Sequence, residues 1–315
     1  MARKQFRPLD FSKVRTYPVT KRFSKVQSAL LGKKVAKGAT LRAFLRGLPD
    51  ILAAQNLKAI ARKIADCHRQ NRTVMLGMGA HPIKVGLSPL IIDFMERGII
   101  HSIALNGAGV IHDFEIAFMG ETSEDVAATL KDGSFGMAEE TGSFINQAIS
   151  EGSKDNLGIG AAVGRAINQK RLRHRKLSIL AKAANLGIPV TSHIAIGTDI
   201  IHMHPKVDGQ ALGDCSLRDF RTLTSIVATL DRGIYLNFGS AVILPEVFLK
   251  AVSLARNLGH PVQNLTTVNL DFLQHYRPLT NVVNRPTMNG GKGYQLTGHM
   301  EIMVPLLFAA VLEEL

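Results

Sequence analysis

Short apolar runs alternate along this sequence with longer segments that have helical periodicity. Strands that alternate with helices of about ten or more residues are typical of βαβ units. The sequence therefore predicts an α/β fold with a doubly wound, mostly parallel, Rossmann-like sheet. The predicted strands are residues 73–77, 101–105, 188–192, 233–238 and 264–269. The main predicted helices are residues 89–97, 137–151, 157–185 with glycine interruptions, 217–230, 245–258 and 299–314, with further helix starts at Thr40, Asp50 and residues 122–125.

Glycine-bearing turns follow several of these strands. Glycine lets a backbone approach a ligand closely, and the N–H groups of a following helix N-terminus can bind an anion. Ligands of parallel sheets bind outside the carboxyl ends of the strands, so we expect these turns to share one nucleotide site. The richest turn has a Gly-x-Gly sequence without the third glycine of a dinucleotide fingerprint. The residues expected at this site are Gly77, Gly79, Asn106, Gly107, Ala108, Gly109, Gly239, Ser240 and, in the late loop 289–293, Gly290.

The composition is that of a globular protein with a large core, since 46% of the 315 residues are hydrophobic. No apolar run reaches the roughly 18 residues of a membrane span, and the basic N-terminus lacks the apolar core of a secretory signal. Two cysteines, Cys67 and Cys215, are too few for a disulfide framework. We therefore expect a cytoplasmic protein that does not contact membranes.

Positive charge is concentrated at the amino terminus. Residues 1–38 hold eleven Lys or Arg side chains and one acid, Asp10, a net +10 out of a total of +13. We predict a basic arm over residues 1–38 and one α/β domain over residues 39–315. Such an arm can bind nucleic acid through phosphate contacts. The alternatives are a solvated extension or a strap across an acidic neighbouring subunit. A second basic cluster, residues 170–176, falls within a helical pattern and indicates an exposed helix face.

The order of these motifs resembles that of deoxyhypusine synthase, an enzyme that uses NAD to move an aminobutyl group from spermidine to a protein lysine. The resemblance runs in register over roughly residues 40–315. It implies the deoxyhypusine synthase-like NAD-binding fold, NAD as cofactor, and a homo-oligomer with active sites between subunits. The segments that carry it are residues 76–86, 106–113, which resembles Thr-Ala-Gly-Gly-x-Glu-Glu-Asp, 188–192, 199–204, 238–242 and 289–293.

Departures from the family's motifs argue against deoxyhypusine synthase activity itself. The family's lysine forms an imine, which requires a primary amine, but Ile243 holds this position, or Leu244 if the register shifts by one. Lys250 lies seven residues beyond Ile243, about 10 Å along a helix. His112 stands at a glutamate position and Lys292 near an aspartate position, and these cations would repel a polyamine. We therefore expect a substrate that is not a polyamine and that carries negative charge.

The resemblance also assigns roles to single residues. His204 matches a histidine that handles protons in the family, so we predict it to be the general acid/base. Lys292 and His112 are predicted to contact the substrate. Asp113 matches an acid at the family's cofactor site and could instead cap a helix, while Asp199 is expected at the cofactor ribose.

A metal site is a further alternative. His202 and His204 alternate, so in an extended segment both imidazoles point the same way, and imidazole suits zinc or iron. Three hypotheses therefore remain. The first is an NAD-binding enzyme that acts on a small molecule by hydride or group transfer. The second is a non-catalytic nucleotide- or RNA-binding protein that uses the arm, and the third is a metal-dependent hydrolase built on the two histidines.

Overall fold

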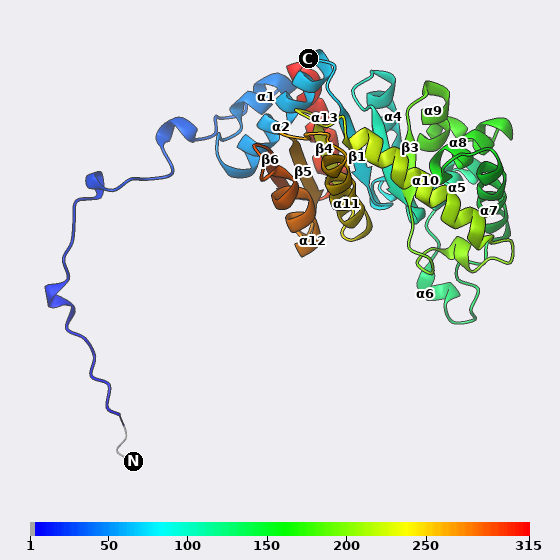
Figure 1. The fold of residues 1–315 in the computed structure, drawn as a ribbon. Helices are drawn as coiled ribbons and strands as arrows, with labels where there is room; N and C mark the ends of the chain where they lie inside the picture. Colours follow the sequence, from blue (N-terminus) through cyan, green and yellow to red (C-terminus); the bar gives the residue numbers. More distant parts are fainter. Residues whose placement is uncertain (1–3) are drawn as a thin grey trace.

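The computed structural model describes residues 4–315, and its centre is a six-stranded, all-parallel β-sheet (Figure 1). The strand order is β3-β2-β1-β4-β5-β6, so the predicted Rossmann-like α/β fold is confirmed. The strands are β1 (Val74–Met78), β2 (Ser102–Asn106), β3 (Val190–His193), β4 (Ile234–Phe238), β5 (Thr266–Asp271) and β6 (Lys292–Thr297).

Thirteen α-helices are described, and they cover both faces of the sheet. They are α1 (Leu41–Gly47), α2 (Leu52–Arg69), α3 (His81–Lys84), α4 (Ser88–Glu96), α5 (Gly107–Met119), α6 (Val126–Thr129), α7 (Glu139–Lys154), α8 (Ile159–Gln169), α9 (Ile179–Leu186), α10 (Gly209–Val227), α11 (Ile243–Asn257), α12 (Tyr276–Pro278) and α13 (Met300–Glu314). Within residues 4–315, none of these helices combines the length and the apolar character that crossing a bilayer requires.

The two faces of the sheet belong to separate apolar clusters. Met75 and Tyr235 pack with α10 and α11 on one face, whereas Leu76 and Leu236 pack with α2, α4 and α13 on the other. Successive side chains of a strand point to opposite faces, so a strand covered on both sides is apolar throughout. This is why β1 and β4 are buried along their whole length.

Helices α7, α8 and α9 lie in the connection between β2 and β3 and gather beyond the β3 edge of the sheet (Figure 1). Helix α8 approaches β3 so closely that a Cβ on Gly160 would lie 2.1 Å from the Val190 carbonyl oxygen. The buried carboxylate of Asp219, on α10, accepts hydrogen bonds from the backbone N–H groups of Gly160 (3.2 Å) and Ser192 (2.8 Å). Asp219 therefore joins the start of α8 to the edge strand.

Several predicted element boundaries need correction. Thr40 caps α1 as predicted, but α2 begins after Ile51 rather than after Asp50. The helix predicted from residues 122–125 is reduced to the single turn α6, which Asp125 caps. The basic cluster at residues 170–176 lies in the break between α8 and α9, because Arg171 has a left-handed backbone (φ 51°), and not on a helix face.

The prediction that the strand at residues 264–269 is the last one is wrong, because β6 follows it. The predicted loop 289–293 runs into this edge strand, and Lys292 pairs with Thr266 at the amino end of β5. Gly290 and Lys292 therefore lie at the edge of the sheet opposite to the carboxyl ends of the strands. The expectation that all the glycine-bearing turns share one site fails for this loop.

Residues 4–29 extend away from the rest of the chain (Figure 1), and each of them is exposed. Their only regular structure is three short 3-10 turns, the last of which ends at Leu30. Backbone contacts with the domain begin at Leu30, whose carbonyl accepts from the Asp50 N–H (2.9 Å), and at Lys33, which donates to the Gly47 carbonyl (2.8 Å).

Candidate active site

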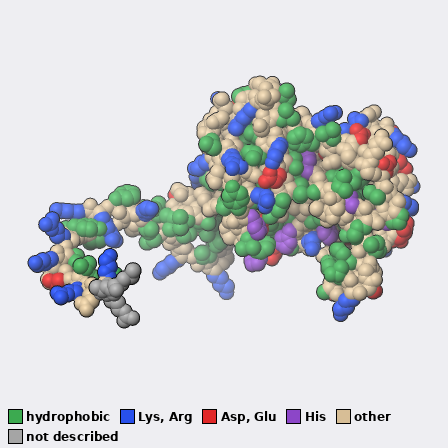
Figure 2. Space-filling view, turned by 60° about the horizontal axis from the view of Figure 1, so that its bottom comes forward, with side chains coloured by type: hydrophobic (Ala, Val, Ile, Leu, Met, Phe, Trp, Pro, Cys, Tyr) green, Lys and Arg blue, Asp and Glu red, His purple; other side chains and the backbone are tan. Residues whose placement is uncertain are grey.

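The carboxyl edge of the sheet brings together most of the predicted cofactor residues. β1 and β4 are neighbours at the point where the strand order reverses, which is where ligands of such folds bind. Gly79 follows β1, Gly239 and Ser240 follow β4, and Asn106 ends β2 and caps α5 through a hydrogen bond from the Gly109 N–H (3.0 Å). Figure 2 turns this side of the molecule toward the viewer and shows several histidine side chains on it.

The glycines nearest to the point where the strand order reverses allow neighbouring elements to pack closely. A Cβ on Gly79 would lie 2.5 Å from the Gly239 carbonyl oxygen, and one on Gly77 would lie 2.2 Å from the Tyr235 hydroxyl. A Cβ on Gly239 would meet the Met300 side chain at 2.3 Å. These glycines therefore let β1, β4 and α13 approach one another, and ligand space has to lie beside them.

A cavity of about 220 Å³ lies next to the first turns of α5, and we call it the α5 cavity. Cavities of about 340 and 600 Å³ lie by α1 and at the amino end of β3, away from the carboxyl edge. The α5 cavity contains three of the predicted site residues, Ala108, His112 and Asp199, whereas Lys292 lines a separate cavity of about 410 Å³ at the start of β6. The wall of the α5 cavity includes Lys84, Ala108, His112, Glu115, Glu124 and Asp199.

A chain of hydrogen bonds orients His112 at this cavity. Nδ1 of His112 lies 2.6 Å from Oγ1 of Thr122, and this hydroxyl donates to Oε2 of Glu115 (2.5 Å). The Thr122 hydroxyl has one hydrogen, so Nδ1 must be the donor to Thr122. We infer that the neutral imidazole carries its proton on Nδ1 and leaves Nε2 as a proton acceptor.

The carboxylate at the end of this chain is held ionised. Burial raises the pKa of Glu115, but hydrogen bonds and charge interactions from His112, Thr122 and Thr141 outweigh burial and leave the pKa below its ordinary value. Thr141, on α7, donates to Oε1 at 3.2 Å. Glu115 can therefore stabilise a protonated His112, whose Nδ1 lies 3.7 Å from Oε2.

Asp199 and His202 place two unpartnered polar atoms beside the start of α5. Oδ2 of Asp199 and Nε2 of His202 lie 4.0 Å apart, and both are buried without a hydrogen-bond partner. Nδ1 of His202 accepts N–H groups from Gly197 and Asp199, so Nε2 carries the proton. A Cβ on Gly107 would lie 2.1 Å from Oδ2 of Asp199. Burial raises the pKa of Asp199, and interactions with His202, Thr198 and the Ala108 backbone oppose that rise.

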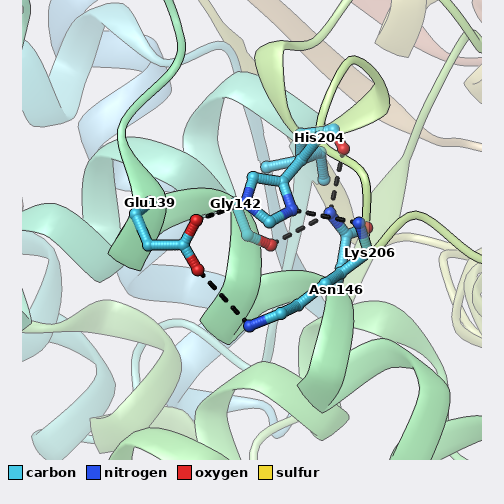
Figure 3. A network of polar contacts seen from close by, with 6 residues as sticks. Glu139, Gly142, Asn146, His204 and Lys206 are labelled. Carbon is cyan, nitrogen blue, oxygen red and sulfur yellow. Dashed lines mark hydrogen bonds and ion pairs between the residues drawn. The ribbon is translucent and has the colours of Figure 1, made fainter.

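His204 lies outside the α5 cavity wall and is tied to α7 (Figure 3). Its Nε2 is 3.2 Å from Oε2 of Glu139, and its Nδ1 accepts the Lys206 N–H at 3.2 Å. Gly142 makes room for the ring, since a Cβ there would lie 2.3 Å from it. With both ring nitrogens engaged, the geometry does not support the general acid/base role predicted for His204.

Two more predicted site residues have other surroundings. Asp113 caps α9: it accepts hydrogen bonds from the Ser178 hydroxyl and the Ile179 N–H, and burial raises its pKa to about 6. This matches the helix-cap alternative and removes Asp113 from the cofactor site. Lys292, which was predicted to contact the substrate together with His112, lies at the opposite edge of the sheet, 4.9 Å from the Tyr294 ring centroid and away from the α5 cavity.

The alternative of a metal site at His202 and His204 is not supported by their geometry. His202 faces Asp199, whereas His204 faces Glu139, so the two imidazoles do not point to one place. Among residues 4–315 no three His, Cys, Asp or Glu side chains are grouped as a metal ion would require. This contradicts the hydrolase hypothesis that rested on the pair.

No protein-family model and no curated protein matches the chain. Similar solved structures include an LOR/SDH-type protein of Methanococcus maripaludis S2, with a TM-score of 0.55 and 14% identity over 95% of this chain and 75% of that one. AgrE in its ternary complex with ornithine and NAD+ has a TM-score of 0.54 and 11% identity over 82% of this chain and 33% of that one. A deoxyhypusine synthase-type protein of Entamoeba histolytica has a TM-score of 0.51 and 11% identity, over 90% of this chain and 96% of that one.

These similarities show the fold. The chain spans 31% of ArgZ, a cyanobacterial arginine dihydrolase, and 33% of AgrE, so it corresponds to about a third of those proteins. One of these distant structural neighbours, AgrE, binds NAD+.

Proposed function

We propose that this protein is an enzyme of deoxyhypusine synthase-like fold that binds NAD or a related nucleotide and acts on a small molecule in the α5 cavity by hydride or group transfer. The hydrogen-bond chain from His112 through Thr122 to Glu115 carries the proposal. A partly buried carboxylate that, through a hydroxyl, fixes the tautomer of an imidazole at a cavity wall is an arrangement suited to a general base. The acid/base role predicted for His204 passes to His112.

In this proposal each member of the chain has a defined task. Glu115 holds the Thr122 hydroxyl, and Thr122 holds the Nδ1–H of His112. Nε2 takes a proton from a substrate hydroxyl or amine, and Glu115 stabilises the imidazolium that forms. NAD, when bound, would supply an acceptor for hydride.

The residues present fit the ribose of a nucleotide better than its pyrophosphate. A ribose hydroxyl between Asp199 and His202 could donate to Oδ2 and accept from Nε2–H, which satisfies two buried groups that lack partners. Two N–H groups in the first turn of α5 are already engaged, since that of Gly109 bonds to Asn106 and that of Ala108 interacts with Asp199. Lys84 is the cation on the cavity wall.

The charged side chains on the wall of the α5 cavity limit the net charge that a substrate can carry. The expected anionic substrate depended on His112 and Lys292 together, and of these two only His112 lies on the cavity wall. Glu115, Glu124 and Asp199 outnumber Lys84 on the wall, so we propose a neutral substrate or one with a single amino group. No lysine begins α11, where Ile243 stands, so the proposed chemistry does not pass through an imine at that position.

Calorimetric titration with NAD, NADH and adenosine tests the cofactor. Asp199→Asn removes the charged acceptor, so NAD affinity should fall about ten-fold or more. Asp214→Asn, which changes a partly exposed acid on α10 that is absent from the wall of the α5 cavity, is the matched control and should bind like wild type. His112→Gln should retain NAD binding and lose turnover. Absence of heat with every nucleotide would contradict the proposal.

A further inference from the structure

The part of the arm that extends away from the domain, residues 4–29, exposes aromatic rings that the domain does not cover. Within residues 4–29, the side chains of Phe6, Phe11, Tyr17 and Phe23 are 87, 75, 65 and 84% exposed. Single exposed apolar residues are ordinary, but a series of rings on one extended segment indicates a binding surface. Their spacing of five, six and six residues distributes the rings along the whole segment.

Basic side chains stand between these rings. Residues 4–29 contain seven Lys or Arg residues and one acid, Asp10. Each ring has a basic residue within two positions, as Lys13 is to Phe11, Arg15 to Tyr17 and Arg22 to Phe23. The segment therefore combines contacts for phosphates with flat apolar faces.

The rest of the molecule does not supply an acidic partner for this segment. Of the 38 Lys and Arg residues, 27 lie in residues 39–315, where 24 of the 25 acids also lie, so the domain has a net charge of +3. A second copy of the chain offers no excess negative charge to hold the arm. Charge complementarity therefore favours a polyanion.

The backbone of the arm distinguishes between polyanions. Pro8 and Pro18 interrupt it, and its 3-10 turns span only three residues each, so no amphipathic helix forms to lie in a membrane interface. An extended segment in which rings alternate with cations suits a single-stranded nucleic acid. Its unpaired bases can stack on the aromatic rings while the cations contact its phosphates.

We propose that the arm binds single-stranded RNA, with its Lys and Arg side chains on the phosphates and its four rings stacked on bases. This function is separate from the nucleotide site at α5. It does not depend on the enzyme proposal.

The charge contribution is tested with the full-length protein and a labelled single-stranded RNA of about 20 nucleotides, longer than the sites of single-strand-binding modules. Fluorescence anisotropy over a salt series gives the affinity and its salt slope. The combined variant Lys13→Gln, Arg15→Gln, Lys21→Gln, Arg22→Gln should bind at least ten-fold more weakly at low salt. Its log–log salt slope should be smaller by up to about 3. The matched control Lys170→Gln, Arg171→Gln, Arg173→Gln, Lys176→Gln loses equal charge from exposed positions and should bind like wild type.

Stacking is tested separately. Phe11→Leu with Phe23→Leu keeps apolar side chains but removes two rings, and should weaken RNA binding by about five-fold or more per ring without changing the salt slope. Duplex RNA of the same length should bind more weakly, because its bases are already stacked.

Several outcomes would overturn the proposal. These are no RNA binding at low salt, equal loss in the arm and control variants, or equal affinity for duplex and single strand. Binding to phosphatidylserine vesicles without binding to RNA would make the arm a membrane contact. Sedimentation in which deletion of residues 4–29 dissociates an oligomer, with RNA binding unchanged, would make it a strap between subunits.

Discussion

The tautomer of the His112 imidazole depends on a single hydroxyl group, that of Thr122. Thr122→Val keeps the shape of the side chain but removes the acceptor for Nδ1–H, so the preference for the Nδ1-protonated tautomer should be lost. Nitrogen NMR of histidine-labelled protein distinguishes the two tautomers directly. Thr122→Ser retains the hydroxyl and should keep the wild-type pattern. A wild-type protein already protonated on Nε2 would contradict the inferred chain.

Gly107 is the position where a side chain would disturb the site most directly. Gly107→Ala places a Cβ 2.1 Å from Oδ2 of Asp199, so the carboxylate has to move away from α5. We expect a loss of about 1–3 kcal/mol in the free energy of unfolding, from overpacking, together with weaker nucleotide binding. Urea denaturation and calorimetry measure the two effects.

Gly213 on α10 provides the matched control for that substitution. A Cβ at Gly213 has nothing within 4 Å, so Gly213→Ala should stabilise the protein by about 0.5–1 kcal/mol, because alanine favours a helix interior. If both variants had the same stability, the contact between Asp199 and Gly107 would not constrain the site.

The sequence predicted some of the site's residues better than their roles. His112 and Asp199 were expected there, and Glu115 lies three positions after His112, a spacing that helical periodicity places on one face. Thr122 and Thr141 come from a loop and from α7, so local pattern could not connect them to Glu115. His204 was expected to be free to transfer protons, but it also bonds to Glu139, 65 positions away in the sequence, and this contact depends on tertiary packing.

At the scale of elements, Asp219 makes the stability of the contact between α8 and β3 depend on pH. Burial raises its pKa to about 7, against hydrogen bonds from Ser192, Gly160 and Ile159 that lower it. The folded protein thus binds this proton more tightly than the unfolded chain, whose carboxyl titrates near 3.8. Stability from this group is complete at low pH and is lost as pH rises toward 7.

The corresponding measurement compares wild type with Asp219→Asn, in which residue 219 cannot titrate. The difference in unfolding free energy, wild type minus variant, should fall by up to about 4 kcal/mol between pH 4 and 8. Asp214→Asn changes a carboxyl whose pKa is lowered by Arg218 and Ser153, so it should show no such fall. A difference that is constant with pH would show that Asp219 folds as a charged group.

The sequence predicted strands correctly where burial on both faces of the sheet gives a continuous apolar run. Strands β1 and β4 are apolar on both faces and are recognisable as continuous runs. Strand β6 was missed because it is an edge strand whose Lys292, Gln295 and Thr297 are exposed. Its glycine-rich approach resembles a loop, although Tyr294 and Leu296 show the alternation of a half-buried strand.

At the scale of the whole molecule, the exposed part of the arm, residues 4–29, should contribute nothing to folding. Deletion of residues 4–29 removes only exposed side chains, so the free energy of unfolding and its denaturant dependence should stay within about 0.5 kcal/mol of wild type. Deletion of residues 4–38 also removes the backbone bonds made by Leu30 and Lys33 and should cost about 1–3 kcal/mol. If the shorter deletion destabilised the protein as much as the longer one, the arm would have to pack on the domain. Its rings would then be unavailable to RNA. Equal stability with lost RNA binding would show instead that the chain keeps a separate binding segment outside its fold.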